Sequence, residues 1–98
     1  MFPTVDRVDD ATLRFRAELG QLLAGLRERA GLSQEALGQQ LGLGQSGVSK
    51  VESGRRGLHV EELVAWVAAL GRRLPSVAEE VHGIYESLVP GSIWEREP

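Results

Sequence analysis

The residues with the most evident chemistry lie in one short stretch, 45–56, and they suit contacts with a polar or anionic partner. This stretch carries amide, hydroxyl and ammonium groups at helical spacing and then two guanidinium groups, namely Gln45, Ser46, Ser49 and Lys50, followed by Arg55 and Arg56. Glutamine and lysine hydrogen-bond the edges of bases in the major groove of DNA, and arginine pairs with phosphate. Two short amphipathic helices with a glycine-bearing turn, as predicted over 32–56, form the layout that places one helix in that groove.

Other kinds of site have little support in the residue types. The segment 42–47 has the pattern G-x-G-x-x-G, but a predicted helix rather than a strand precedes it, so we interpret its glycines as turn residues. His59 and His82 have no cysteine or organised carboxylate partner in the sequence, and the serines have no base at catalytic spacing. The sequence therefore predicts a protein that is not an enzyme and that uses no cofactor or metal.

The charge distribution decides whether DNA binding is compatible with the composition. The 98 residues carry a net charge of −3 and include no cysteine, which excludes disulfides. Residues 27–60 hold five basic and three acidic residues, whereas residues 61–98 hold three basic and seven acidic residues. Positive charge is thus concentrated in the segment predicted to meet phosphate. The modest excess argues against tight sequence-independent binding.

The elements that must position these side chains are all predicted to be helices. Apolar residues recur at helical spacing and no segment alternates like a strand, so an all-α fold of about five helices is expected. Serines at 33 and 76 suit N-caps, and glycines at 31, 42, 54 and 71 suit helix ends. The predicted helices span 10–30, 34–41, 45–53, 59–70 and 77–88, with a kink near Gly20 left open because glycine lowers helix propensity by ~1 kcal/mol.

Inward faces are predicted from the same periodicity. For the helix at 59–70, the apolar side is expected to comprise Val60, Leu63, Val64, Val67 and Leu70, with Trp66 also used in packing. No apolar run approaches the ~20 residues of a membrane span, and the first residues lack a signal-peptide pattern. A cytoplasmic protein without membrane contact is therefore expected.

The residues at Leu32–Gly54 resemble the lambda-repressor-like helix-turn-helix family, also called the Cro/cI or XRE type, and the resemblance covers roughly residues 19–71. The matching segments are LRERAGLSQEAL at 26–37, LGLGQSGVSKVESGRR at 41–56 and ALG at 69–71. The spacing between them fits that of the family without any inserted residue. The resemblance implies a DNA-binding domain at 19–71. Outside it we expect an N-terminal extension with the start of the first helix at 1–18, and a C-terminal helix and tail at 72–98.

The resemblance also implies a role for each polar residue of this domain. Base contacts fall to Gln45, Ser46, Ser49 and Lys50, phosphate contacts to Gln34, Arg55 and Arg56, and an internal salt bridge to Arg27 and Glu52. Gly44 stands where the family commonly has a serine or threonine cap, which implies a slightly weaker cap. Gly47 stands at a frequent base-contact position, so one side-chain contact is absent.

A second candidate interface is an apolar stripe on the predicted helix at 77–88. Its members fall at i, i+4, i+7, i+8 and i+11, namely Val77, Val81, Ile84, Tyr85 and Leu88. Because the DNA-binding domain is expected to end at Gly71, we interpret the stripe as a dimer interface. The alternative, in which this helix completes the core of one chain, stays open.

Together these features predict a sequence-specific transcriptional regulator, a homodimeric repressor that binds double-stranded DNA. Its near-palindromic operator would have half-sites one helical turn, ~34 Å, apart. The alternative function is that of an antitoxin-type protein that autoregulates and binds a protein partner through Tyr85, Ile93 and Trp94.

Overall fold

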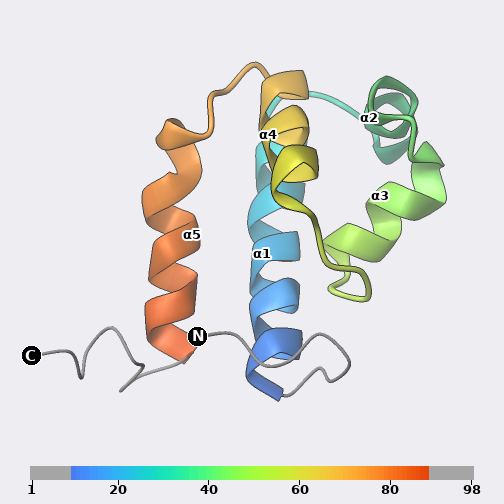
Figure 1. The fold of residues 1–98 in the computed structure, drawn as a ribbon. Coiled ribbons are helices and arrows are strands. Elements are labelled where there is room, and N and C mark those ends of the chain that lie inside the picture. The colour runs from blue at the N-terminus through green and yellow to red at the C-terminus, as the bar shows by residue number, and fades with distance from the viewer. Residues whose placement is uncertain (1–9, 89–98) are drawn as a thin grey trace, which may run out of the picture.

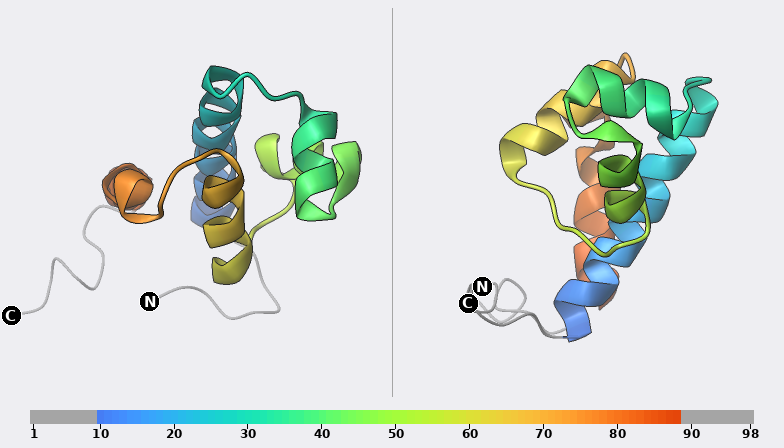
Figure 2. Two further views of the ribbon diagram at one scale, coloured as in Figure 1. Left: turned by 90° about the horizontal axis from the view of Figure 1, so that it is seen from above. Right: turned by 90° about the vertical axis from the view of Figure 1, so that its right-hand side faces the viewer.

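A computed structural model of the chain describes residues 10–88, and within them it confirms the predicted all-α fold with five helices and no strand. The helices are α1 (Asp10–Arg29), α2 (Gln34–Leu41), α3 (Gly44–Glu52), α4 (Val60–Ala69) and α5 (Pro75–Leu88). Helix α1 runs through the centre, with α2 and α3 on one side and α5, antiparallel to α1, on the other (Figure 1). The view from above in Figure 2 also separates the α2–α3 pair from α5, so the two candidate interfaces lie on opposite sides of α1.

The core forms where four of the helices and the start of the fifth meet. Its largest fully buried side chain is Trp66 of α4, which lies in one core cluster with Val67 of the same helix and with buried leucines and valines of the other helices, including Leu23, Leu37, Val48 and Val77. Apolar area removed from water stabilises a fold by about 25 cal/mol per Å², so these side chains provide the main driving force for packing. The indole N–H of Trp66 has no hydrogen-bond acceptor among the described residues.

The inward face of α4 differs from the prediction. Val60 and Val64 are 72% and 43% exposed, so placing them in the core was wrong. Helix α4 begins at Val60, and Val60 and Val64 lie one turn apart on a side of this helix that faces solvent. Leu63, Trp66 and Val67 of α4 pack inward together with Leu70, the residue that caps its C-terminus, and these four follow the i, i+3, i+4, i+7 spacing of one helical face.

Helix ends follow the predicted capping in one case and depart from it in another. The hydroxyl of Ser33 accepts the N–H of Ala36 at 3.0 Å and caps α2 as expected. Ser76 is not the cap of α5, because the helix begins one residue earlier, at Pro75. Proline is favoured in the first helical turn, where its missing N–H leaves no hydrogen bond unmade. The hydroxyl of Ser76 instead donates to the carbonyl oxygen of Arg73 at 2.7 Å.

Two glycines allow α3 to approach its neighbours closely. Helix α1 is continuous through Gly20, where a Cβ atom would collide with the carbonyl oxygens of Val51 and Glu52 at the end of α3. A Cβ atom at Gly38 of α2 would collide in the same way with the backbone of Gly44. Both glycines are therefore explained by close backbone contacts rather than by a kink.

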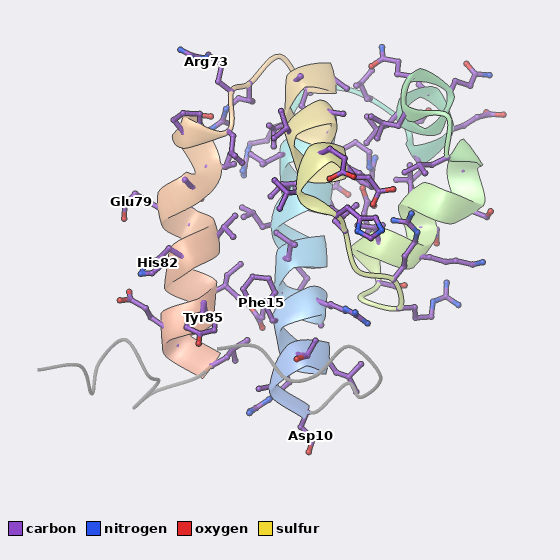
Figure 3. The ribbon with its side chains drawn as sticks, in the orientation of Figure 1. Asp10, Phe15, Arg73, Glu79, His82 and Tyr85 are labelled. Atoms are coloured by element: carbon purple, nitrogen blue, oxygen red, sulfur yellow. The ribbon has the colours of Figure 1, made fainter. Side chains whose placement is uncertain are left out.

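The apolar stripe of α5 faces α1 within the same chain. Val77 is completely buried in the common core and Val81 packs against it, so the core crosses the predicted domain boundary between residues 71 and 72. Figure 3 shows Phe15 projecting from α1 toward α5, whereas Glu79 and His82 project from the opposite side of α5. This placement leaves Val77 no surface for a second chain, which corrects its assignment to a dimer interface.

Candidate nucleic-acid interface

The outer face of α3 carries the side chains to which base contacts were assigned. Val48 and Val51 are 0% and 2% exposed, and they fix which side of α3 faces the core. On the remaining surface, Gln45, Ser46 and Lys50 are exposed and Ser49 is partly buried. The right-hand view of Figure 2 looks onto this side of the molecule, with α2 and α3 toward the viewer. The structure therefore brings the four side chains together on one short helix at the surface.

The turn between α2 and α3 needs a glycine where it enters α3. Gly42 ends α2 with φ 71°, and Gly44, the first residue of α3, has φ 70°. A residue with a side chain costs roughly 1–2 kcal/mol in this left-handed region. Gly44 is thus required by the backbone conformation, and describing it as a weakened version of a serine or threonine cap was incomplete.

A chain of hydrogen bonds connects α3 at both ends to α1 and α2. Arg27 Nε donates to Glu52 Oε2 at 2.7 Å, and Arg27 Nη2 donates to Glu52 Oε1 at 3.1 Å. Gln34 Nε2 donates to Glu52 Oε1 at 2.8 Å, and Gln34 Oε1 accepts from Gln45 Nε2 at 2.8 Å. Gln34 therefore connects Gln45, at the start of α3, with Glu52, at the end of the same helix.

The pair at the centre of this network is buried. The side chains of Arg27 and Glu52 are only 11% and 6% exposed, and Arg27 Nη1 also donates to the carbonyl oxygen of Leu32 at 2.8 Å. The hydrogen bond with Glu52 raises the pKa of Arg27 above its usual value. Because each charged group has several partners, the pair is held in one geometry. It therefore fixes the position of the C-terminal end of α3 relative to α1.

The two consecutive arginines after α3 have different surroundings. Arg55 is exposed, and its Nε donates to the hydroxyl of Ser53 at 2.9 Å. Arg56 instead forms a two-pronged ion pair with Glu62 of α4, with Nη2–Oε2 at 2.8 Å and Nη1–Oε1 at 3.3 Å. The structure thus leaves the guanidinium of Arg55 at the surface and engages that of Arg56 within the chain.

Glu62 is a residue that the sequence reasoning missed. Besides Arg56, its carboxylate accepts the backbone N–H of His59 at 3.0 Å, just before the first turn of α4. The hydrogen bonds from Arg56 and, second, from the His59 backbone lower the pKa of Glu62 to about 2. A glutamate three residues after the N-cap is the sequence signal of such a contact. The predicted helix began at His59 itself, so His59 was not recognised as the N-cap and Glu62 was not recognised as its partner.

A third basic side chain, Arg16 of α1, lies beside the segment 53–59 that joins α3 to α4. It packs so closely on Gly57 that a Cβ atom there would lie 2.7 Å from Arg16 Nε. Nothing in the local sequence around Arg16 signals this contact, because it depends on how α1 passes the 53–59 segment. Positive charge therefore extends from α3 along this segment to α1.

Other kinds of site are not found in the part of the chain that the structure describes. Residues 10–88 contain no group of three or more histidine or acidic side chains placed to hold a metal ion. None of their helices combines the length and apolar character needed to cross a bilayer. Ile93 and Trp94, to which partner binding was assigned, lie outside the described residues.

Comparisons with known proteins agree with this geometry. A family model described as a helix-turn-helix domain matches residues 18–80, which is more than half of the chain. A solved structure that is similar is the crystal structure of the clp gene regulator ClgR from C. glutamicum, with a TM-score of 0.65 and 27% sequence identity. The alignment covers 72% of this chain and 91% of that one. No curated protein matches this chain.

Proposed function

This chain belongs to the helix-turn-helix domain family, and from that premise we propose that it is a sequence-specific DNA-binding transcriptional regulator. The observation that supports this most is the outward polar face of α3, held in place at both ends by the Arg27–Glu52–Gln34–Gln45 network. The similar structure, by its title, is that of a gene regulator. A rigid, short helix with exposed amide and ammonium groups suits insertion into the major groove.

Base recognition falls to the exposed positions of α3. Gln45 can pair with adenine N6 and N7, and Lys50 can donate to the O6 and N7 acceptors of guanine. Ser46 and Ser49 offer hydroxyl groups on the same side of the helix. The hydrogen bond from Gln45 to Gln34 limits the rotamers of Gln45 before DNA arrives. Less conformational entropy is then lost when the side chain meets a base.

Phosphate contacts fall to groups that flank α3. Gln34 lies at the start of α2 and uses one amide N–H toward Glu52, which leaves its second N–H for a phosphate oxygen. Arg55 is exposed just beyond the end of α3, and its guanidinium group forms no ion pair with the described residues. Such contacts set the register of the protein on the duplex without reading its sequence.

We further propose that the protein acts as a homodimeric repressor on a near-palindromic operator. One copy of α3 has few side chains long enough to reach bases, so two copies are needed for specific binding. Within α5, the part of the stripe beyond Val77 remains for a dimer contact, because Val81, Ile84, Tyr85 and Leu88 are only partly buried. These four side chains are the proposed dimer interface.

The proposal is tested by selecting bound sequences from a pool of random DNA duplexes with the full chain. The expected result is enrichment of one short motif that occurs twice, with its two copies in inverted orientation about one helical turn apart. Binding without enrichment of any motif would contradict sequence-specific recognition. Enrichment of a single unrepeated motif would retain DNA reading by α3 and overturn the homodimer.

A further inference from the structure

The ion pair between Arg56 and Glu62 occupies a basic side chain that is otherwise well placed to meet DNA. Arg56 directly follows the exposed Arg55, and its side chain is 35% exposed, so a phosphate oxygen can approach it from solvent. Two of its nitrogens are already committed, Nη2 to Glu62 alone and Nη1 to both Glu62 and the carbonyl oxygen of Gly57 at 3.1 Å. A phosphate that approaches the Nη1–Nη2 end of the guanidinium must therefore compete with the carboxylate for these two donor groups.

Glu62 itself does not depend on Arg56 for its position. Its Oε1 atom accepts the N–H of His59 at 3.0 Å, which anchors the carboxylate at the start of α4. A negative charge at this end of a helix is also favoured by the helix dipole. The carboxylate is thus held in place, whereas the long side chain of Arg56 can exchange one anion for another.

From these contacts we infer that Glu62 is an intramolecular competitor for the DNA backbone, which holds Arg56 away from phosphate and limits the affinity of the protein for any duplex. This inference rests on the proposed function and adds a residue that sets the strength of the DNA contact. Arg55, with no carboxylate on its guanidinium among the contacts of residues 10–88, provides the phosphate contact on this side of α3 in the unaltered protein.

The test uses Glu62→Gln, which removes the negative charge and keeps an oxygen that can accept the N–H of His59. Binding to a fluorescently labelled random-sequence duplex is measured across a range of salt concentrations. Each added phosphate contact steepens the plot of log K against log salt by about 0.9. We therefore expect a slope steeper by about 0.9 per bound chain, and an affinity about 5- to 10-fold higher at ~0.1 M salt.

Glu61→Gln is the matched control, because it makes the same change in net charge one residue away. The Glu61 side chain is exposed, and its carboxylate takes part in none of the hydrogen bonds or ion pairs found within residues 10–88. If both variants gain affinity and slope equally, general charge accounts for the change and the inference is overturned. If neither gains while both remain folded by circular dichroism, it is overturned as well.

A double variant identifies the side chain that is released. Adding Arg56→Gln to Glu62→Gln is expected to remove the gain in slope and affinity. A gain that persists without Arg56 would overturn the inference, even if Glu62→Gln behaves as expected. The proposed function fails separately, if the unaltered chain binds no duplex or if its binding does not change when Lys50 and Arg55 are replaced.

Discussion

Two arginine–glutamate pairs lie at the C-terminal end of α3 and just beyond it, and they differ in burial far more than in hydrogen-bond geometry. Arg27–Glu52 and Arg56–Glu62 both make two N–H···O contacts, with shortest distances of 2.7 and 2.8 Å. The first pair has side chains 11% and 6% exposed, and the second has side chains 35% and 25% exposed. The two pairs thus have similar hydrogen bonds, but Arg27–Glu52 lies inside the fold and Arg56–Glu62 lies nearer the surface, next to Arg55, the proposed phosphate contact.

The difference in exposure gives the two pairs different roles. A buried pair cannot exchange its partners for water or phosphate, so removing one member leaves a charge uncompensated. A partly exposed pair such as Arg56–Glu62 contributes less to stability and is screened by salt, but its arginine remains accessible to another anion. The first pair therefore positions α3, and the second controls how much positive charge α3 and the following segment present to DNA.

The largest effect is expected when the buried pair is broken. Glu52→Ala leaves Arg27 without its anion and Gln34 without its acceptor, and should lower the free energy of unfolding by about 3–5 kcal/mol. Urea denaturation followed by circular dichroism measures this loss, with Glu62→Ala as the comparison. If Glu62→Ala is as destabilising as Glu52→Ala, the proposed division between the two pairs is wrong.

A smaller effect is expected when Arg55, the exposed arginine next to the second pair, is removed. Arg55→Ala should flatten the salt dependence of duplex binding by about 0.9 per bound chain, because one phosphate contact is lost. The melting temperature should hardly change, since the Arg55 side chain is exposed. Salt titrations of the variant and the parent chain on the same duplex test this. An unchanged slope would exclude Arg55 as a phosphate ligand.

The smallest effect concerns pH. Since the pKa of Glu62 is lowered from 4.5 to about 2, its ionised form contributes stability that is present above pH 4.5 and is lost as the pH falls toward 2. The difference in stability between the parent chain and Glu62→Gln should therefore shrink over that range. Urea midpoints of both proteins at several pH values measure it. A difference that stays constant from pH 6 to pH 2 would contradict the assigned ion pair.

Local sequence pattern was sufficient to predict the number of helices and the outward face of α3. Val48 and Val51 lie three residues apart in a short helix, so the side that they bury leaves Gln45 and Lys50 at the surface. The Arg27–Glu52 contact joins residues 25 positions apart, and only resemblance to a known family pointed to it. Helix periodicity alone does not bring those two residues together.

The features that the sequence did not predict depend on how elements meet. The Arg56–Glu62 pair requires both the start of α4 and the path of the 53–59 segment. The apolar stripe of α5 was recognised, but an apolar stripe does not specify whether it packs on the same chain or on another. Val60 and Val64 match the spacing of an inward face, yet both are exposed, because they lie on a side of α4 that the described residues leave open to solvent.

The central claim is that α3 reads DNA, and the most direct test is the affinity of Lys50→Ala and Gln45→Ala for the duplex selected by the parent chain. We expect each change to weaken binding to this duplex by ~1–3 kcal/mol, with much less effect on a random duplex and no change in helical content. Unchanged affinity of both folded variants for the selected duplex would contradict the claim.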